Sequence, residues 1–388
     1  MNAIFPARRT RHRQGSMAVL AALFLVILLA CVAFAVDLGY LCLARSQAQN
    51  AADSAAMAAA WKMLDEKRAH GSAAFAELLA EAQDTAGKFA AANQVAGQAP
   101  QVGLNPGNDP GGDLVFGRMT SGGQMSTPAD PLSWNSVFVR VRRDAKLNGP
   151  VRLFFARSLG IRSAAIEAEA IATFQDGVQG FRTPTGPTSL VPFAMSVQDW
   201  KNILAGTGGA DNWTWNAQSK SVSAGADGAR EQKLFPDKTK IDGSIVPGNF
   251  GTLNIGLPNL GAPDLLRQIG QGISAADLSY YGGELALNPA TGTLQLGGDT
   301  GITAPVFSTA QTIIGKPITV FLYDTAVHGG SNSVFTIVGF AGARIMYVEG
   351  AGGGPGALYV QPAVVVDNAA IPGTAPSTFV YRKVILSK

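Results

Sequence analysis

An uncharged apolar run at residues 17–36 constrains this chain more than any other feature of its sequence. The run reads MAVLAALFLVILLACVAFAV, and no charged residue lies between Arg13 and Asp37. A helix of this length, at a rise of about 1.5 Å per residue, extends about 30 Å, which matches the hydrocarbon core of a bilayer. The run therefore predicts a single transmembrane helix over residues 17–36.

The residues before the run indicate which way the helix crosses the membrane. This short segment holds four arginines: Arg8, Arg9, Arg11 and Arg13. Lys and Arg next to a membrane span favour the cytoplasmic side. We therefore expect residues 1–16 to form a basic cytoplasmic tail. The chain would be a single-pass protein of a bacterial inner membrane, with a periplasmic or extracellular body that begins at Asp37.

The remaining charge gives no sign of a nucleic-acid partner. The net charge of +3 comes from 30 basic and 27 acidic residues, and the tail holds four of the basic ones. A nucleic-acid-binding domain needs clustered cations on its folded surface. Because the rest of the chain is close to neutral, we expect no nucleic-acid partner.

Three kinds of processing remain open besides a retained anchor. Residues 33–35 (AFA) fit the small-x-small rule for signal peptidase, which would produce a mature N-terminus near Val36. Residues 28–31 (LLAC) loosely resemble a lipobox, although the apolar run continues beyond them. Cleavage after Gly15 would resemble that of type IV prepilins, but Leu20 stands where those proteins have glutamate.

The helix is expected to continue beyond the membrane. Residues 37–68 are rich in Ala, Leu, Gln and Met, and no proline occurs between Pro6 and Pro100. This composition favours a helix from about residue 17 to residue 68, with Gly39 as a place where it could bend. Small residues that would let another helix approach closely form a candidate packing face: Ala48, Ala52, Ala55 and Ala59. Alanine is also simply a strong helix former, and composition does not choose between the two.

Several short segments in this region resemble a known family. In order they read QGSMAV at 14–19, AVDLG at 35–39, LAR at 43–45 and QNAADSAA at 49–56. Together with the apolar span they resemble the N-terminal module of TadG-like proteins, which belong to the bacterial tight-adherence (Flp) pilus-assembly systems. Weaker similarity follows at three places: GNFG at 248–251, IIGKP at 313–317 and IVGFA at 337–341.

The resemblance implies a non-enzymatic, membrane-anchored envelope protein that takes part in pilus assembly or anchoring. Its implied partners are the inner membrane and other pilus-assembly or envelope proteins, pilin-like helices among them. Many TadG-like chains carry an Asp-x-Ser-x-Ser metal motif in a von Willebrand A-like domain. This sequence lacks that motif, so metal-dependent adhesion is not implied.

Residues 37–178 are expected to form the helical extension and a small α+β domain. Apolar residues at three- and four-residue steps predict a helix over 72–95, and alternation predicts strands over 137–142 and 166–174. Residues 97–135 are rich in Pro and Gly and predict a loop. Asn148-Gly149-Pro150 predicts a short helix with Phe154 and Phe155 inside it and Gly160 just past its end.

Residues 183–388 are expected to form a β-rich domain. Apolar runs separated by Gly- and Pro-containing turns lie at 318–323, 333–340, 343–349, 357–366 and 378–386. The polar stretch between residues 202 and 251 holds Trp213 and Trp215, either as exposed interaction residues or as buried anchors of a long loop. The fold class is thus α+β: a transmembrane helix continuing as a long extracytoplasmic helix, a small α+β domain and a mainly antiparallel β-rich C-terminal domain.

The sequence contains no convincing catalytic, cofactor or metal motif. Asp324, His328, Ser331 and Ser333 only superficially resemble a hydrolase cluster, because residues 329–333 (GGSNS) lack the final glycine of a nucleophile elbow. Zinc, EF-hand, P-loop and dinucleotide-binding spacings are absent from the sequence, so we expect no metal, cofactor or nucleotide and no enzyme. The alternative function is a secreted or periplasmic β-rich binding module whose N-terminus is a cleaved export signal.

Overall fold

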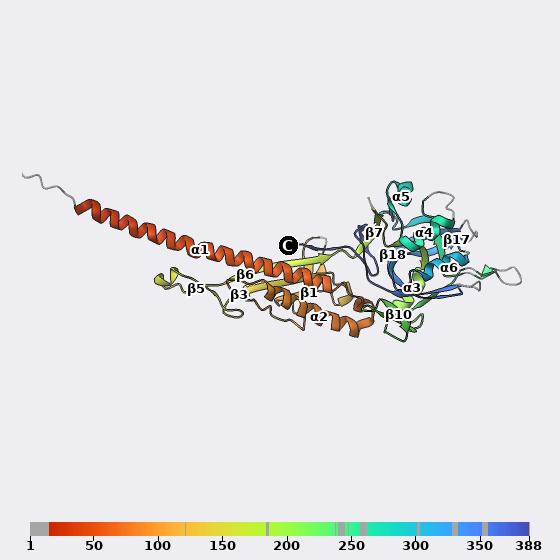
Figure 1. Ribbon diagram of the computed structural model, residues 1–388, viewed down its shortest axis with the longest axis horizontal. Coiled ribbons are helices and arrows are strands. Elements are labelled where there is room, and N and C mark those ends of the chain that lie inside the picture. The colour runs from red at the N-terminus through yellow and green to blue at the C-terminus, as the bar shows by residue number, and fades with distance from the viewer. Residues whose placement is uncertain are drawn as a thin grey trace, which may run out of the picture.

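A computed structural model describes residues 15–120, 122–183, 186–236, 238–239, 245–246, 248–256, 262–300, 303–327, 333–350 and 356–387. The molecule is elongated: the long helix α1 (Gly15–Lys62) leads into a body of two parts (Figure 1). The arginines of the basic tail (Arg8, Arg9, Arg11 and Arg13) lie outside the described residues. The architecture is α+β, with a long apolar N-terminal helix and a mainly antiparallel β-rich C-terminal region, as predicted.

Helix α1 changes its surroundings along its length. It runs without interruption through Gly39. Residues 17–36 are almost entirely exposed, whereas most alanines of the helix from Ala44 onward, Ala58 excepted, are fully buried. Among the described residues, α1 is the one helix long and apolar enough to cross a membrane. One half of the helix is thus exposed, and the other half is part of the core of the body.

A tight turn ends α1 earlier than residue 68, where the sequence predicted its end. Asp65 accepts a hydrogen bond from the backbone N–H of Lys67 at 3.1 Å and begins the 3₁₀ helix η1 (Glu66–Ala69). Helix α2 (Gly71–Ala92) then returns along α1 (Figure 1). Gly71, with φ of +87°, allows this reversal because a side chain would strain that backbone conformation.

The first part of the body is a five-stranded antiparallel sheet that packs against α1. Its order is β2 (Met125–Ser126), β1 (Leu114–Met119), β3 (Ser136–Arg143), β6 (Ile166–Phe174) and β23 (Val384–Leu386). The alternating valines of β3 are buried in one core with the alanines of α1 and the apolar stripe of α2. The strands predicted at 137–142 and 166–174 are therefore confirmed.

Two predictions for this part were wrong. Strand β1 lies inside the segment 97–135, where Pro and Gly predicted only a loop. The side chain of Asn108 pairs with both backbone groups of Phe116 at 2.7 and 2.8 Å and so holds the preceding loop along β1. After Pro150 the chain forms β4 (Val151–Arg152), the 3₁₀ helix η3 (Ala156–Leu159) and β5 (Ser163–Ala164). Phe154 and Phe155 are exposed there rather than inside a helix.

The second part is built on a closed ring of strands. The sheet order is β11 (Gln232–Leu234), β19 (Ala357–Pro362), β18 (Ser333–Glu349), β16 (Leu294–Asp299), β14 (Phe250–Leu253), β8 (Leu190–Ser196) and β17 (Pro317–Val327). Because β17 also pairs with β18, five of these strands close on themselves. Most pairs are antiparallel, and β8 with β17 is parallel. The predicted runs at 333–340 and 343–349 form one long strand, β18.

Smaller elements complete this part. Helices α3 (Val197–Leu204), α4 (Ala262–Gln271) and α6 (Ala304–Gln311) share one core with the ring. A second hydrophobic core is bordered by the short helix α5 (Ala275–Leu278) and by the strands β15 (Glu284–Ala286), β7 (Gly177–Arg182) and β21 (Ala370–Pro376). The hairpin β9 (Trp213–Asn216) and β10 (Ser221–Ala224) carries both tryptophans, and Trp213 stacks on Tyr347 of β18 with ring centroids 4.6 Å apart.

Two buried arginines and one strand join the parts of the body. Arg344 of β18 donates through Nη1 to Oε2 of Glu66 at 2.8 Å and lies 4.1 Å from the ring centroid of Trp215. Arg68 donates to two backbone carbonyls of the first part and packs over Tyr381, close to the chain's end. Strand β23 belongs to the sheet of the first part, although the sequence predicted 183–388 as one separate domain.

Glu231 is a buried acidic side chain beside the β9–β10 hairpin. Its Oε2 accepts from the backbone N–H of Asn212 at 2.8 Å, whereas Oε1 has no hydrogen-bond partner among the residues that the structure describes. Burial first, and then the nearby charges of Asp211 and Asp227, raise the pKa of Glu231 to about 7. The folded protein therefore favours the neutral form of this carboxyl.

We expect Glu231 to make stability fall as the pH rises. Its pKa is higher in the folded than in the unfolded chain, so its stabilising proton is fully present below about pH 4.5 and is lost on approaching pH 7. A Glu231→Gln variant stays neutral and should gain up to about 3 kcal/mol over the wild type between pH 4.5 and pH 8. Urea unfolding at several pH values measures this gain.

The exposed Glu284→Gln provides the matched control for this exchange and should show no such pH-dependent gain. A Glu231→Gln effect of the same size at all pH values would contradict the assignment.

Candidate functional site

The small-residue face of α1 lies inside the body. Four alanines of this face are completely buried: Ala48, Ala52, Ala55 and Ala59. They contribute to the core that α1 shares with α2, β3 and β6. Their small side chains let the helix lie close to its neighbours. Because the chain itself covers this face, a partner helix does not have access to it in this structure.

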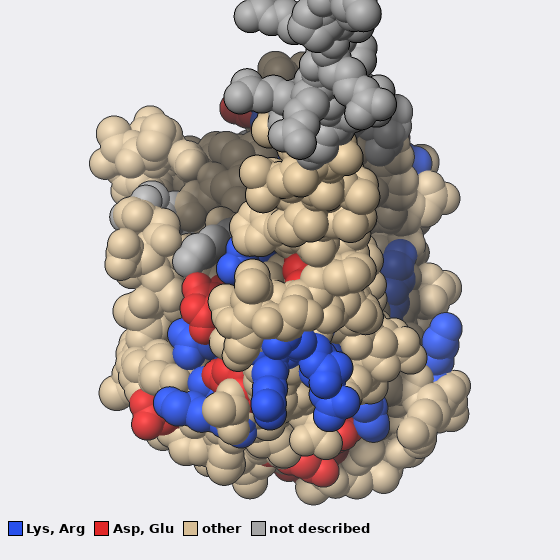
Figure 2. Space-filling model, turned by 90° about the vertical axis from the view of Figure 1, so that its left-hand side faces the viewer, with Lys and Arg blue, Asp and Glu red and all other residues tan. Residues whose placement is uncertain are grey.

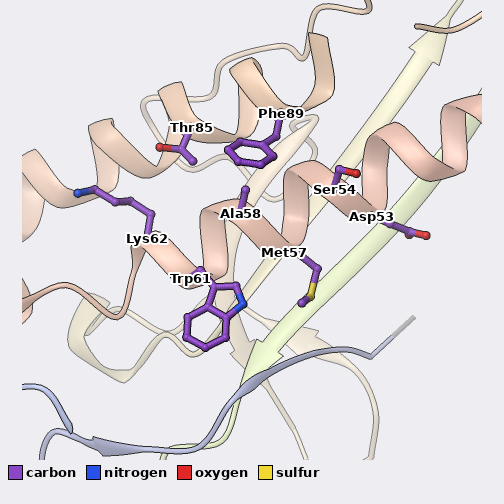
Figure 3. A pocket seen from close by; sticks show the side chains of 8 residues that line it. All are labelled: Asp53, Ser54, Met57, Ala58, Trp61, Lys62, Thr85 and Phe89. Carbon is purple, nitrogen blue, oxygen red and sulfur yellow. The ribbon is translucent and has the colours of Figure 1, made fainter. Parts of the chain in front are cut away.

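Another flank of α1 is open and forms a groove with α2. This groove, which we call the outer groove, has a volume of about 710 Å³ and is lined by Asp53, Ser54, Met57, Ala58, Trp61, Lys62, Thr85 and Phe89. Trp61 is 46% exposed and Phe89 is 50% exposed. In Figure 3, Ala58 points toward Phe89, whereas Trp61 and Met57 project from the neighbouring flank of α1. Large apolar side chains are therefore presented at the surface.

Charged residues fix the ends of the outer groove. Lys62 pairs with Oε2 of Glu81 at 2.8 Å and with Oδ2 of Asp65 at 3.1 Å. The hydrogen bond that Lys62 donates to Glu81, and then its hydrogen bond to Asp65, hold the pKa of Lys62 above its ordinary value. Near the other end, Gln49 donates to Asp53 at 2.8 Å. An apolar centre with exposed aromatic residues inside a polar rim is the usual composition of a protein–protein interface.

No motif in the sequence predicts this groove. Phe89 fits the three- and four-residue spacing of the α2 stripe, which predicts burial, and yet it lies at the edge of the packed face. Trp61 continues the α1 pattern without any motif of its own. The available signal was a pair of large aromatic residues on two helices otherwise built from alanine.

Asp37 holds a second region of the body against α1, at the end of the apolar half of that helix. Its Oδ1 accepts from the backbone N–H of Phe154 at 2.7 Å, and its Oδ2 accepts from those of Phe155 at 3.0 Å and Ala156 at 2.6 Å. Burial favours the neutral carboxyl, but these three donors outweigh it and hold the pKa of Asp37 below its ordinary value. Tyr40 packs edge-on against Phe154, with ring centroids 5.0 Å apart. We call residues 150–164 the membrane-side tip.

The residues of the superficial hydrolase cluster do not form a described site. Asp324 is exposed on β17, and Ser333 is buried at the start of β18. His328 and Ser331 lie outside the described residues. Within the described part of the chain, no three His, Cys, Asp or Glu side chains are grouped so that they could hold a metal ion.

Comparison with protein families gives two matches in the N-terminal part. Residues 15–62 match the family described as Flp pilus-assembly TadE/G-like, and residues 41–172 match the family described as Tad-like Flp pilus-assembly. The matched residues cover α1, α2 and most of the first sheet, including the outer groove and the membrane-side tip. No curated protein and no solved structure matches the chain.

Removing the Asp37 carboxylate should release the membrane-side tip from α1. In Asp37→Ala the N–H groups of Phe154, Phe155 and Ala156 lose their acceptor, so their amides should exchange hydrogen about ten-fold faster or more. Hydrogen–deuterium exchange of peptides covering residues 150–164 measures this. Asp84→Ala removes an exposed carboxylate of α2 and should leave the tip unchanged. Equal exchange in both variants would contradict the role of Asp37.

Proposed function

Because residues 15–62 and 41–172 match two Flp pilus-assembly families, we propose that the chain is a TadG-like, non-enzymatic, membrane-anchored component of Flp/Tad-type pilus assembly or anchoring in the cell envelope. The observation that carries the proposal is the two-part character of α1. Its apolar residues 17–36 are uncovered by the body, whereas the rest of the same helix is built into the core. A load on the body would reach the bilayer without a flexible linker.

The proposed topology follows from charge. The basic tail with Arg8, Arg9, Arg11 and Arg13 stays in the cytoplasm, and the body lies in the periplasm or outside the cell. The role is mechanical and associative: the protein holds other components at a fixed height above the inner membrane. The families that it matches act in pilus assembly, so these components are envelope or pilus proteins.

The outer groove is the proposed contact for such a component. It begins near Asp53, about 25 Å beyond the end of the apolar run along the helix axis, and it continues to Lys62. Its long axis follows α1, and its centre is apolar with exposed aromatic residues. An amphipathic helix lying along α1 and α2 fits this shape and chemistry. We propose that this helix belongs to a pilin-like or other pilus-assembly protein.

The anchor proposal is tested on cells of a bacterium that express the full chain with a C-terminal tag. We expect an intact N-terminus, recovery with the inner membrane, and a tag that protease reaches from the periplasm. A soluble product that begins near Val36 would refute the anchor and favour the alternative, a secreted or periplasmic β-rich binding module. Mass spectrometry of the recovered N-terminus separates the two.

Truncating Trp61 should weaken partner binding without unfolding the protein. A photo-cross-linking residue at Thr85 places the probe inside the outer groove. We expect cross-links to a pilin-like or pilus-assembly protein, and Trp61→Ala should reduce their yield about ten-fold, because exposed aromatic anchors dominate interface energies. Mass spectrometry identifies the partner, and surface pilin is counted in the same cells.

Tyr280→Ala is the matched control, since Tyr280 is a similarly exposed aromatic residue in the second part of the body. Unchanged cross-links and unchanged surface pilin in Trp61→Ala would refute the outer groove as the contact.

A further inference from the structure

The membrane-side tip exposes apolar side chains that a water-facing loop would not be expected to carry. They are Phe154, Phe155, Leu159 and Ile161, and Leu159 is 83% exposed. The segment is nonetheless well ordered by its contacts: β4 pairs with β5, and Asp37 binds three of its backbone amides. Gly160, with φ of +86°, ends the 3₁₀ helix η3 and turns the chain back. The structure therefore holds an apolar apex in a fixed position.

The position of this apex is beside the apolar half of α1. A groove of about 540 Å³ separates the two, lined on the helix by Leu29, Ala30, Val32, Ala33, Phe34 and Asp37 and on the tip by Phe155, Ala156, Ser158 and Leu159. Leu29 lies seven residues before Val36, which is about 10 Å along the helix axis. In Figure 1 the neighbouring strand β5 lies beside α1, at the end of the body nearest the chain's N-terminus. The apex thus extends past Val36, the outer end of the predicted span, in the direction of the middle of that span.

Positive charge surrounds the apolar apex. Residues 140–162 contain seven Arg and Lys residues and one acidic residue, Asp144, and two of the seven, Arg140 and Arg142, pair with Glu169 and Asp113. A cavity of about 360 Å³ at the base of the tip has four charged side chains in its lining: Arg143, Arg152, Arg157 and Arg162. Figure 2 shows Lys and Arg gathered on the end of the body that faces along α1 toward the N-terminus. This end therefore combines an exposed apolar centre with a basic surround.

Arg143 is the buried side chain in the lining of this cavity, and backbone carbonyls hold it in place. It is 6% exposed, and its guanidinium donates to the carbonyls of Gly149 at 3.1 Å and Val95 at 2.9 Å. Arg152, Arg157 and Arg162 are exposed around it. Guanidinium groups bind phosphate oxygens in a bidentate manner, and basic residues near a bilayer are attracted to anionic headgroups.

We propose that the membrane-side tip is a second membrane contact, which inserts Phe155, Leu159 and Ile161 into the leaflet on the body's side of the bilayer. Arg152, Arg157 and Arg162 bind the phosphates of anionic phospholipids around it. The inference rests on the proposed function in one respect, namely that α1 spans the membrane. Charge complementarity and the shared groove with α1 favour a lipid surface over a protein as the occupant.

Fluorescence quenching in vesicles tests this on the full chain. Cys31 and Cys42, both exposed, are replaced by alanine, and a single cysteine at Leu159, Val26 or Val327 carries an environment-sensitive fluorophore. The vesicles contain phosphatidylglycerol and lipids with a quencher on the acyl chain. We expect quenching at Val26 in the span and at Leu159 in the tip. Val327 is an exposed apolar residue of β17 and should remain unquenched.

The other outcomes separate this inference from the anchor. Quenching at Val26 without quenching at Leu159 overturns the second contact and leaves the anchor intact. A Leu159 label that aqueous iodide cannot reach and lipid does not quench overturns it in favour of a protein contact. Absence of quenching at Val26 refutes the anchor, and the inference falls with it.

Charge reversal tests the lipid headgroups separately. In the double variant Arg157→Glu/Arg162→Glu, the ratio of inserted to free tip should fall by about five-fold for each arginine removed. The added carboxylates should lower this ratio further. The loss should appear in vesicles with phosphatidylglycerol and be much smaller in pure phosphatidylcholine. Arg182→Glu, at an exposed position in β7, is the control and should have no effect. Equal quenching in all three proteins overturns the proposed phosphate binding.

Discussion

The packing of the α1 alanines on the first sheet is the interaction on which the rest of the molecule depends. With no side-chain atom beyond Cβ, these residues let one continuous helix lie directly against β3, β6 and α2. Larger residues at Ala52 or Ala55 would push the helix away from the sheet, since both are completely buried. The close packing makes the second half of α1 a core element. The apolar half is therefore attached to the body by the helix itself rather than by a linker.

The second part of the body depends on the same core through long-range contacts. Strand β23 comes from the end of the chain and forms the edge of the first sheet beside β6. Arg344 and Arg68 bind groups on both sides of the junction, and each is 2% exposed. An arginine buried this deeply is stabilising only while its partners are in place. The two parts therefore hold each other in a defined arrangement. As a result, the position of α1 also determines where the closed ring of strands lies.

The sequence predicted the elements with strong local periodicity and missed those that depend on distant partners. The apolar run, the α2 stripe and the alternation in β3 and β6 were each readable within a short window. Closure of the ring through β17 and β18, and the return of β23, join residues far apart in the chain. Phe154 and Phe155 look like core residues in the sequence, so a buried helix was predicted there. The basic cluster at 140–162 was hidden because acidic residues elsewhere cancel it in the net charge.

Two independent features now define how deep this protein would sit in a bilayer. The first is the length of the apolar run, which places the outer boundary near Val36. The second is the membrane-side tip, which is held on α1 by Asp37 and lies beside Leu29. The offset between these positions is about 10 Å, and apolar groups of interfacial segments are buried by about 5–10 Å. Because the alanines of α1 are packed in the same core as the sheet that carries the tip, the span and the tip would reach their preferred depths together.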